Sequence, residues 1–222
     1  MKFPNAIHLI SLLISLGLSA RGNMILNGSF ETNAAGSTRY NMANSTFNSI
    51  VGSATAFGTA EEIDLIAGNP YGSVPQNGNW KLALHTRSAA EYDAFSFSLS
   101  QPVLSGQTYV LDFYAQAVLN FTPTIGAVEV GLSNSPTSFG TTIFSGTPLS
   151  SANGWTHFST IFLAPSNAQF LTVQTGSNFP TWDHIDNFSL AVLVPEPSAG
   201  MLLLIAVAFG GCNQESAQPG RR

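Results

Sequence analysis

The stretch Ala94-Phe95-Ser96-Phe97-Ser98-Leu99 alternates between small and bulky apolar side chains. Successive side chains of an extended strand point to opposite faces, so Phe95, Phe97 and Leu99 share one face. This period of two is typical of a strand that buries one face and leaves the other in a polar environment. The stretch therefore predicts a half-buried β-strand.

The same period recurs along the body of the chain, and no convincing helical period interrupts it. Turns rich in Gly, Pro and Asn separate the segments, as at Gln76-Asn77-Gly78 and Asn153-Gly154. Residues 33–59 lack a clear period and are interpreted as long loops with at most one strand. About nine or ten short strands predict an all-β fold, an antiparallel β-sandwich of the jelly-roll type. The other predicted strands are 24–30, 62–67, 80–85, 108–117, 127–132, 158–162, 169–175 and 184–192.

The composition fits one such domain with short appendages. The chain has 222 residues, of which 44% are hydrophobic and only 9% are charged. Between Asn23 and Val194 three basic residues stand against ten acidic ones, a formal charge of -7. Such a body repels phosphate backbones and anionic lipids, which excludes a nucleic-acid binder. The single cysteine, Cys212, can form neither an internal disulfide nor a cysteine-based zinc site.

Residues 1–22 have the order of a secretory signal peptide. Lys2 precedes an apolar run from Ala6 to Leu18, and small residues follow before Asn23. The alternatives are a membrane anchor or a buried helix, but a run of about 13 residues is too short to span a bilayer of roughly 30 Å. We therefore expect export and a mature protein that begins at Asn23.

The other end of the chain combines Pro195-Glu196-Pro197, an apolar run at residues 199–211 and the terminal pair Arg221-Arg222. This combination resembles the PEP-CTERM sorting signal, found on exported proteins of bacteria that make extracellular polysaccharide. The resemblance implies that residues 195–222 are recognised and removed by a membrane-embedded exosortase, with this protein as its substrate. Residues 212–220 depart from the family pattern, in which the arginines follow the apolar run closely.

The length of the apolar run favours a transient role in the membrane. As a helix, residues 199–211 would measure about 20 Å, less than the roughly 30 Å hydrocarbon core of a bilayer. Such a helix can hold the protein briefly while the terminal arginines stay in the cytoplasm. The alternative is a terminal helix packed on the domain, but this run has no polar face. We expect the processed protein in the cell envelope, at the cell surface or in the extracellular matrix.

The body opens with Asn27-Gly28-Ser29-Phe30-Glu31 and closes with Ile185-Asp186-Asn187-Phe188-Ser189-Leu190. This pairing resembles galactose-binding-like jelly rolls and carbohydrate-binding modules, in which the first and last strands are neighbours. The resemblance implies a structural calcium ion where they meet, with Glu31 and Asp186 as carboxylate ligands and backbone oxygens near Ser29 as further ones. Calcium takes six to eight hard oxygen ligands of these kinds. The alternative is a solvated Glu31 and an Asp186 that belongs to a turn.

Sugar binding requires aromatic platforms and a few planar polar partners, because sugar C–H faces pack on rings while hydroxyls take directional hydrogen bonds. Tyr71 and Trp182, flanked by prolines, are the candidates with the best prospect of exposure. The alternative interpretation is that Trp80 and Trp155 fill the core of the sandwich. The aromatic candidates are Tyr71, Trp80, Tyr92 and Trp182, and their polar neighbours are Asn77, Asn79, Lys81, His85, Arg87 and Asp183. From these we predict a carbohydrate-binding set of Tyr71, Trp80, Trp182, Asn79, Arg87 and Asp183.

The sequence contains no familiar nucleophile or metal-protease motif. Glu61 and Glu62 are adjacent and would point to opposite faces of a strand, so they cannot face one substrate together. Asp183 and Asp186 also diverge in an extended chain. We therefore expect an exported, non-catalytic protein with possible carbohydrate binding. The alternatives are a structural matrix protein that binds no sugar and a secreted polysaccharide-degrading enzyme.

Overall fold

The computed structural model describes residues 22–117, 127–149, 154–176 and 180–194, with the exception of the Tyr71 side chain. Arg21–Leu193 form one compact unit. The predicted signal peptide, apart from Gly22, and the predicted sorting tail lie outside the described residues. The boundaries 1–22, 23–194 and 195–222, and the apolar helix 199–211, therefore stay predictions. Among the described residues no helix is long and apolar enough to cross a membrane.

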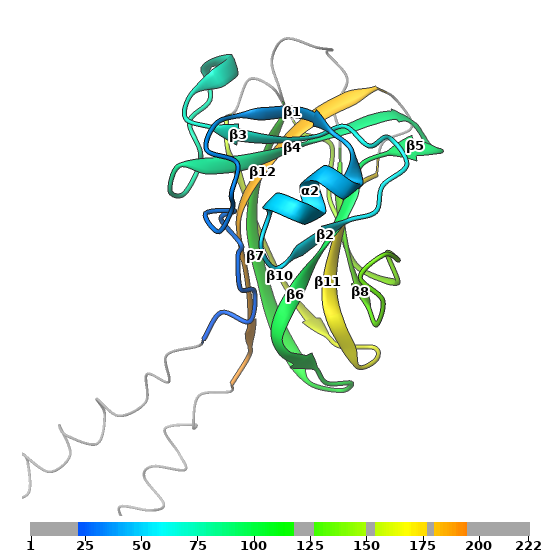
Figure 1. Ribbon diagram of the computed structural model, residues 1–222. Helices are drawn as coiled ribbons and strands as arrows, with labels where there is room; N and C mark the ends of the chain where they lie inside the picture. Colours follow the sequence, from blue (N-terminus) through cyan, green and yellow to red (C-terminus); the bar gives the residue numbers. More distant parts are fainter. Residues whose placement is uncertain (1–21, 118–126, 150–153, 177–179, 195–222) are drawn as a thin grey trace, which may run out of the picture. The chain divides into compact units, whose positions relative to one another are not determined.

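Two antiparallel sheets form the body (Figure 1). The larger sheet has the order β1 (Arg39–Met42), β3 (Ile63–Ala67), β4 (Trp80–Ser88), β12 (Thr181–Val192), β7 (Thr108–Ala117) and β10 (Thr156–Leu163), with β5 (Glu91–Tyr92) paired to β4. The smaller sheet has the order β2 (Ala54–Ala56), β6 (Ala94–Val103), β11 (Ala168–Thr175), β8 (Val128–Ser133) and β9 (Thr141–Ser145). The predicted all-β antiparallel sandwich is confirmed.

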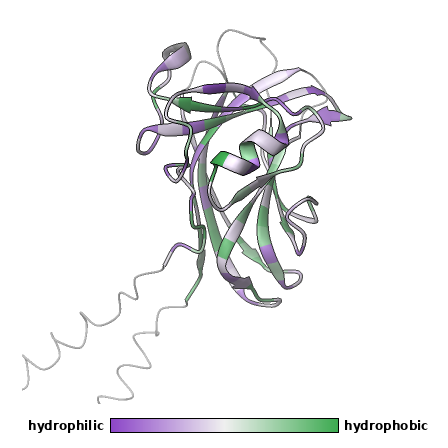
Figure 2. Ribbon diagram, in the orientation of Figure 1, coloured by the Kyte–Doolittle hydropathy of each residue, from purple (hydrophilic) through white to green (hydrophobic). Residues whose placement is uncertain are grey.

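The core lies between the two sheets and consists of the side chains that the alternating pattern selects. Phe95 and Phe97 of β6 and Phe113 of β7 are fully buried. The ring of Phe188 on β12 lies 5.2 Å from that of Phe97 and 4.8 Å from that of Phe113, so it joins the two sheets. Figure 2 shows hydrophobic and hydrophilic segments alternating along the long strands. Burial of each such ring contributes roughly 1.5–3 kcal/mol.

The predicted strand at residues 24–30 is wrong, although its predicted position beside the last strand is right. Ile25 forms only an isolated bridge with Leu99, and the segment then turns. The Phe188 N–H donates to the Gly28 carbonyl at 3.0 Å, which places the segment next to β12. The turn forms because the Asn27 side chain accepts the Thr32 N–H at 2.9 Å. Gly28 is required there, since a Cβ would collide with the Phe188 carbonyl oxygen.

Residues 33–59 hold more regular structure than the sequence predicts: β1, β2 and the helix α2 (Asn44–Ile50). A helix of seven residues is too short to produce a readable period, and only Phe47 is buried in it. Tertiary contacts hold it instead. The Asn48 side chain accepts the Ala56 N–H at 2.6 Å and donates to the Ala56 carbonyl at 3.2 Å, which ties α2 to β2. A 3-10 turn, η1 (Pro70–Gly72), completes the list of described elements.

Candidate functional site

One face of the larger sheet packs on the core. The opposite face points away from the core and is called the outer face. Leu82 and Leu84 of β4 are fully buried in the core. Strand alternation therefore places Lys81, His85 and Arg87 on the outer face. The β4–β12 register pairs His85 with Trp182, which brings residues 97 positions apart in sequence onto the same face.

Trp182 and His85 form a stacked pair on the outer face. Their ring centroids lie 4.3 Å apart and their planes differ by 6°. His85 Nδ1 contacts the Glu62 carboxylate, and Arg87 reaches the same carboxylate with Nε at 3.0 Å from Oε2 and with Nη2 at Oε1. The Arg87 side chain is 53% exposed, whereas that of Glu62 is 18% exposed. The group thus presents a ring pair beside a solvent-facing guanidinium.

The charge of Glu62 is stabilised by its neighbours. Burial raises the pKa of Glu62, but hydrogen bonds from Arg87 and His85 oppose it and bring the pKa below its ordinary value of 4.5. Asp93 is fully buried and holds the backbone of both Glu62 and His85. Its carboxylate accepts the Glu62 N–H at 2.9 Å and the His85 N–H at 2.8 Å. Burial raises the pKa of Asp93 to about 7. Glu62 is therefore held as an anion paired with Arg87.

A loop, residues 73–79, covers the middle of the outer face. The Ser73 carbonyl accepts a hydrogen bond from the Lys81 ammonium, and the Ser73 hydroxyl accepts one from the Gln116 side-chain amide. Gln116 Nε2 in turn donates to His184 Nδ1 at 3.0 Å, and Lys81 and His184 are almost completely buried. Burial lowers the pKa of Lys81 to about 8, while Asp186 opposes the shift. Burial, followed by the charge of Lys81, lowers the pKa of His184 to about 3, so its ring is neutral.

Aromatic rings continue across the sheet toward β10. Trp155 donates its indole N–H to the Val74 carbonyl of the covering loop at 2.9 Å, and its ring lies 6.4 Å from that of His184. Tyr114 of β7 stacks on His157 of β10 at 4.7 Å, and His157 Nε2 lies 3.2 Å from the Asp112 carboxylate. The ring row is the set Trp182, His85, His184, Trp155, Tyr114 and His157.

The predicted carbohydrate-binding residues occupy different parts of the body. Trp182 and Arg87 lie together on the outer face. Trp80 is half-buried and packs against the core, as the alternative interpretation held, and Asn79 is exposed beside it. Asp183 is fully buried on the core side of β12. Tyr71 belongs to η1, but its side chain lies outside the described residues.

Sequence reasoning missed most of the ring row. Trp155 was assigned by the alternative interpretation to the core, yet it lies outside the core cluster and contacts the covering loop. His157 and Tyr114 gave no signal as single residues. The sequence shows that Tyr114 and Asp112 share one face of a strand, but it does not show that β7 pairs with β10, which brings His157 beside them.

Glu31 and Asp186 hold the same turn. Glu31 Oε1 accepts the backbone N–H groups of Asn79 and Trp80 at 2.7 and 2.9 Å, and Asp186 Oδ2 accepts that of Asn77 at 2.9 Å. Asp186 is fully buried and lies in β12 rather than in a turn. Burial raises the pKa of Asp186 to about 7. Backbone hydrogen bonds from Asn77, Asn187 and Gln76 lower this pKa, whereas the nearby charge of Glu31 raises it.

A cation would relieve the repulsion between these two carboxylates, so their charge suits calcium. The two carboxylates supply fewer ligands than a calcium ion takes. Within the described ranges no group of three or more His, Cys, Asp or Glu side chains could hold a metal ion. A calcium ion beside Glu31 and Asp186 would therefore take most of its six to eight oxygens from backbone carbonyls, such as those near Ser29, and from water.

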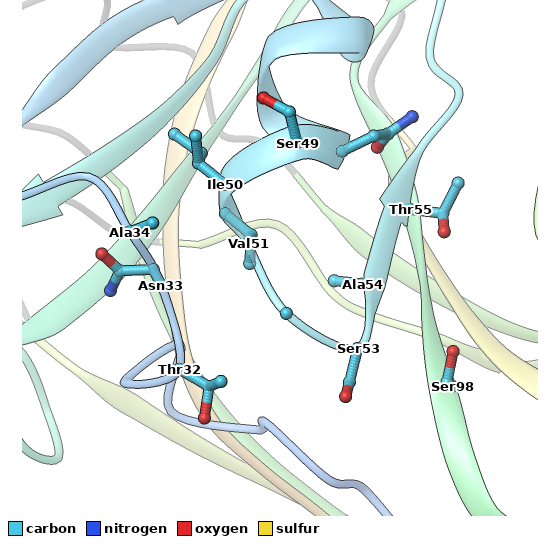
Figure 3. Close-up of a pocket in the computed structure, with 12 residues that line it drawn as sticks. Thr32, Asn33, Ala34, Ser49, Ile50, Val51, Ser53, Ala54, Thr55 and Ser98 are labelled. Carbon is cyan, nitrogen blue, oxygen red and sulfur yellow. The ribbon is translucent and has the colours of Figure 1, made fainter.

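A separate pocket of about 460 Å³ lies between residues 32–34 and the α2–β2 connection (Figure 3). Its lining combines small, hydroxyl, amide and aliphatic side chains, including Thr32, Asn48 and Ser98. None of the residues that line it is aromatic or charged. The pocket therefore lacks the flat rings that a sugar face requires.

Solved structures of other proteins share the fold of the body. No model of a known protein family matches the chain, and no curated protein matches it. The K2 cleaved adhesin domain of Lys-gingipain is similar with a TM-score of 0.51 and 13% identity, over 80% of this chain and 99% of that chain. At this identity the likeness concerns the fold alone.

Carbohydrate-binding β-sandwich domains are also among the structural neighbours. The CBM22-1 xylan-binding domain of Paenibacillus barcinonensis Xyn10C has a TM-score of 0.48 and 14% identity, over 80% of this chain and 99% of that chain. The CBM22-1–GH10 modules of Clostridium thermocellum xylanase 10B, complexed with xylohexaose, have a TM-score of 0.47 and 18% identity, over 77% of this chain and 29% of that chain.

Proposed function

We propose that this protein is an exported, non-catalytic component of the cell envelope or extracellular matrix that binds a polysaccharide along the ring row. The observation that carries the proposal is the gathering of rings on one sheet face: His85 from β4, Trp182 from β12, Tyr114 from β7, His157 from β10 and Trp155 immediately before β10. His184, the sixth ring of the row, is buried and would not contact the ligand. Rings on a flat sheet face form an extended platform, which suits a chain of sugars better than a single small molecule.

The polar groups beside the rings match sugar hydroxyls. Arg87 offers guanidinium N–H donors in a fixed planar arrangement, and Glu62 and Asp112 offer carboxylate acceptors. The ion pair between Arg87 and Glu62 holds both groups in one geometry, which reduces the entropy that a ligand would otherwise have to freeze. Trp182 is one of the two tryptophans of the row and is supported from one side by His85.

The experiment measures binding of the purified protein to a panel of bacterial and plant polysaccharides. We expect Trp182→Ala to weaken binding by roughly tenfold, which corresponds to a loss of about 1.4 kcal/mol of stacking. Thr55→Ala, which alters the pocket beside α2, is the matched control and should leave binding unchanged.

Each other result selects an alternative. A folded sample that binds no polysaccharide would favour the structural matrix protein. If Thr55→Ala loses binding and Trp182→Ala does not, the polysaccharide site would be the pocket beside α2 rather than the ring row. Release of new reducing ends from a polysaccharide would show a degrading enzyme.

We further propose that an exosortase-type enzyme processes the chain at Pro195-Glu196-Pro197 after the apolar run has entered the membrane. The support is the sequence order of that motif, the run 199–211 and the pair Arg221-Arg222. Mass spectrometry of the extracellular protein tests it. We expect a C-terminus close to Pro197, and mature peptides that extend to Arg221 would contradict the proposal.

We also propose a structural calcium ion beside Glu31 and Asp186. Because such an ion binds the folded state alone, calcium should raise the melting temperature relative to a chelator. Glu31→Gln should abolish that difference, whereas Glu91→Gln, an exposed carboxylate on β5, should preserve it. Identical melting curves of the unmodified protein in calcium and in chelator would remove the ion from the proposal.

A further inference from the structure

One end of the larger sheet exposes an apolar surface. The β10–β7–β12 register aligns Ile161, Val110 and Ala191 in one row across the outer face. In the next row Leu163 pairs with Thr108, whose carbonyl accepts the Leu193 N–H at 2.9 Å. Ile161 is 61% exposed and Leu163 is 65% exposed, so two large aliphatic side chains stand on the same face at the end of β10.

The neighbouring turn extends this surface. Leu104, in the β6–β7 turn, is 56% exposed. The Gly106 N–H of that turn donates to the Ala164 carbonyl at 2.9 Å, so Leu104 belongs to the same end of the sandwich as Leu163. The apolar end is the surface formed by Leu104, Val110, Ile161, Leu163, Ala191 and Leu193.

The apolar end carries no formal charge. No Asp, Glu, Lys or Arg occurs in the segments that form this end, residues 97–111, 158–173 and 187–194. The first charged side chain along β7 is Asp112. The charges of the described body thus lie toward the other end or on other surfaces, although the body as a whole is strongly acidic.

Both ends of the body's chain emerge here. The Met24 N–H donates to the Leu190 carbonyl at 2.7 Å, so the first and last residues of the body are neighbours. Only residues 195–198 separate Val194 from the apolar run 199–211. Four residues span at most about 14 Å, so a membrane that holds the run must lie close to the apolar end.

We propose that the apolar end rests on the surface of an uncharged lipid bilayer while residues 199–211 hold the chain in the membrane. This inference rests on the membrane attachment in the proposed function. An uncharged surface fits because the acidic body repels anionic lipids. The ring pair of Trp182 and His85 would then face the medium, because it lies at the opposite end of β12, roughly 35 Å away at 3.3 Å per residue.

The test uses the full chain with Cys212→Ser and a single environment-sensitive label, added to phosphatidylcholine vesicles that contain a nitroxide-bearing lipid. A label at Leu163→Cys should be quenched at least about threefold more than one at Val74→Cys, since interfacial apolar groups lie about 5–10 Å into the headgroup boundary. Val74 is a matched control, being 59% exposed in the covering loop.

A second variant distinguishes contact between the apolar end and the lipid surface from attachment through residues 199–211. With the label at Leu104→Cys, the double substitution Ile161→Ser and Leu163→Ser should remove the quenching while the chain still sediments with vesicles. Both replaced side chains are mainly exposed, so the fold should survive.

The remaining outcomes overturn the proposal. Sedimentation with vesicles and equal quenching at Leu163 and Val74 would refute docking alone. Failure to sediment at all would refute both docking and the membrane attachment on which it rests. A lipid-free dimer that Ile161→Ser dissociates would assign the apolar end to a second copy of the chain, through the edge strand β10.

Discussion

At the scale of single residues, Asp183 is a carboxylate enclosed by the body. It is fully buried on β12, and its Oδ2 accepts the Thr181 hydroxyl at 3.3 Å. Its Oδ1 has no hydrogen-bond partner in the described part of the chain. Burial raises the pKa of Asp183 to about 7, against the smaller lowering effect of Thr181. The folded protein therefore favours the protonated acid at this position.

This shift predicts how stability depends on pH. The folded state holds a proton that the unfolded chain releases above its ordinary pKa of 3.8, so the contribution to stability is present below that value and is lost as pH rises through about 7. Asp183→Asn removes the titration. We expect the variant to melt at least about 2 °C above the parent at pH 8.

The two proteins should melt at similar temperatures near pH 4. Glu129→Gln, which replaces a carboxylate on β8, is the control and should retain the parent's pH dependence between 4 and 8. A parent-like pH dependence in Asp183→Asn would contradict the role given to burial.

At the scale of elements, tertiary contacts rather than local propensity hold the shortest pieces. The helix α2 lacks a side-chain cap at its N-terminus and has no acidic residue in its first turn. Its position depends on Asn48, whose amide satisfies both backbone groups of Ala56 in β2. The covering loop is held in a similar way by Ser73, Val74 and Asn77.

The contact between α2 and β2 gives a test at this scale. Asn48→Ala leaves the Ala56 N–H and C=O without their partner, which should cost about 1–3 kcal/mol. Urea unfolding measures the loss. Ser49→Ala, which removes only a bond to the Thr46 carbonyl within α2, should cost less than about 1 kcal/mol. Equal losses in the two variants would show that α2 is held by other contacts.

At the scale of the whole molecule, a cluster of rings joins the two sheets. Phe113 of the larger sheet lies between Phe188, Phe158 and Phe144, the last of which belongs to β9 of the smaller sheet. The described residues include no cysteine, so no disulfide supports this junction. The sandwich thus depends on packing between its layers.

Phe113→Ala should therefore destabilise the whole body. We expect a loss of roughly 3–5 kcal/mol, the usual cost of removing a buried Phe ring. Urea unfolding followed by tryptophan fluorescence and by circular dichroism should still give one coincident transition. Ile161→Ala, a mainly exposed residue on the adjacent β10, should cost less than about 1 kcal/mol. A small loss in Phe113→Ala would mean that other contacts join the sheets.

The sequence by itself determined the strands and their buried faces. The segments at 94–99, 108–117 and 127–132 alternate with a period of two, and this period is a local property that needs no knowledge of the partner strand. The matching strands bury Phe95, Leu111 and Val130 as predicted. Short elements such as α2 escaped prediction because seven residues cannot establish a period.

Only the tertiary structure decided which outward-facing residues meet. Strand order places β12 beside β4 and β10 beside β7, and these two pairings join Trp182 to His85 and Tyr114 to His157 across long separations in sequence. The covering loop buries Lys81, which the sequence pattern leaves exposed. Alternation states which side of a strand is buried, whereas the partner of each exposed side chain depends on long-range register, which a single strand does not encode.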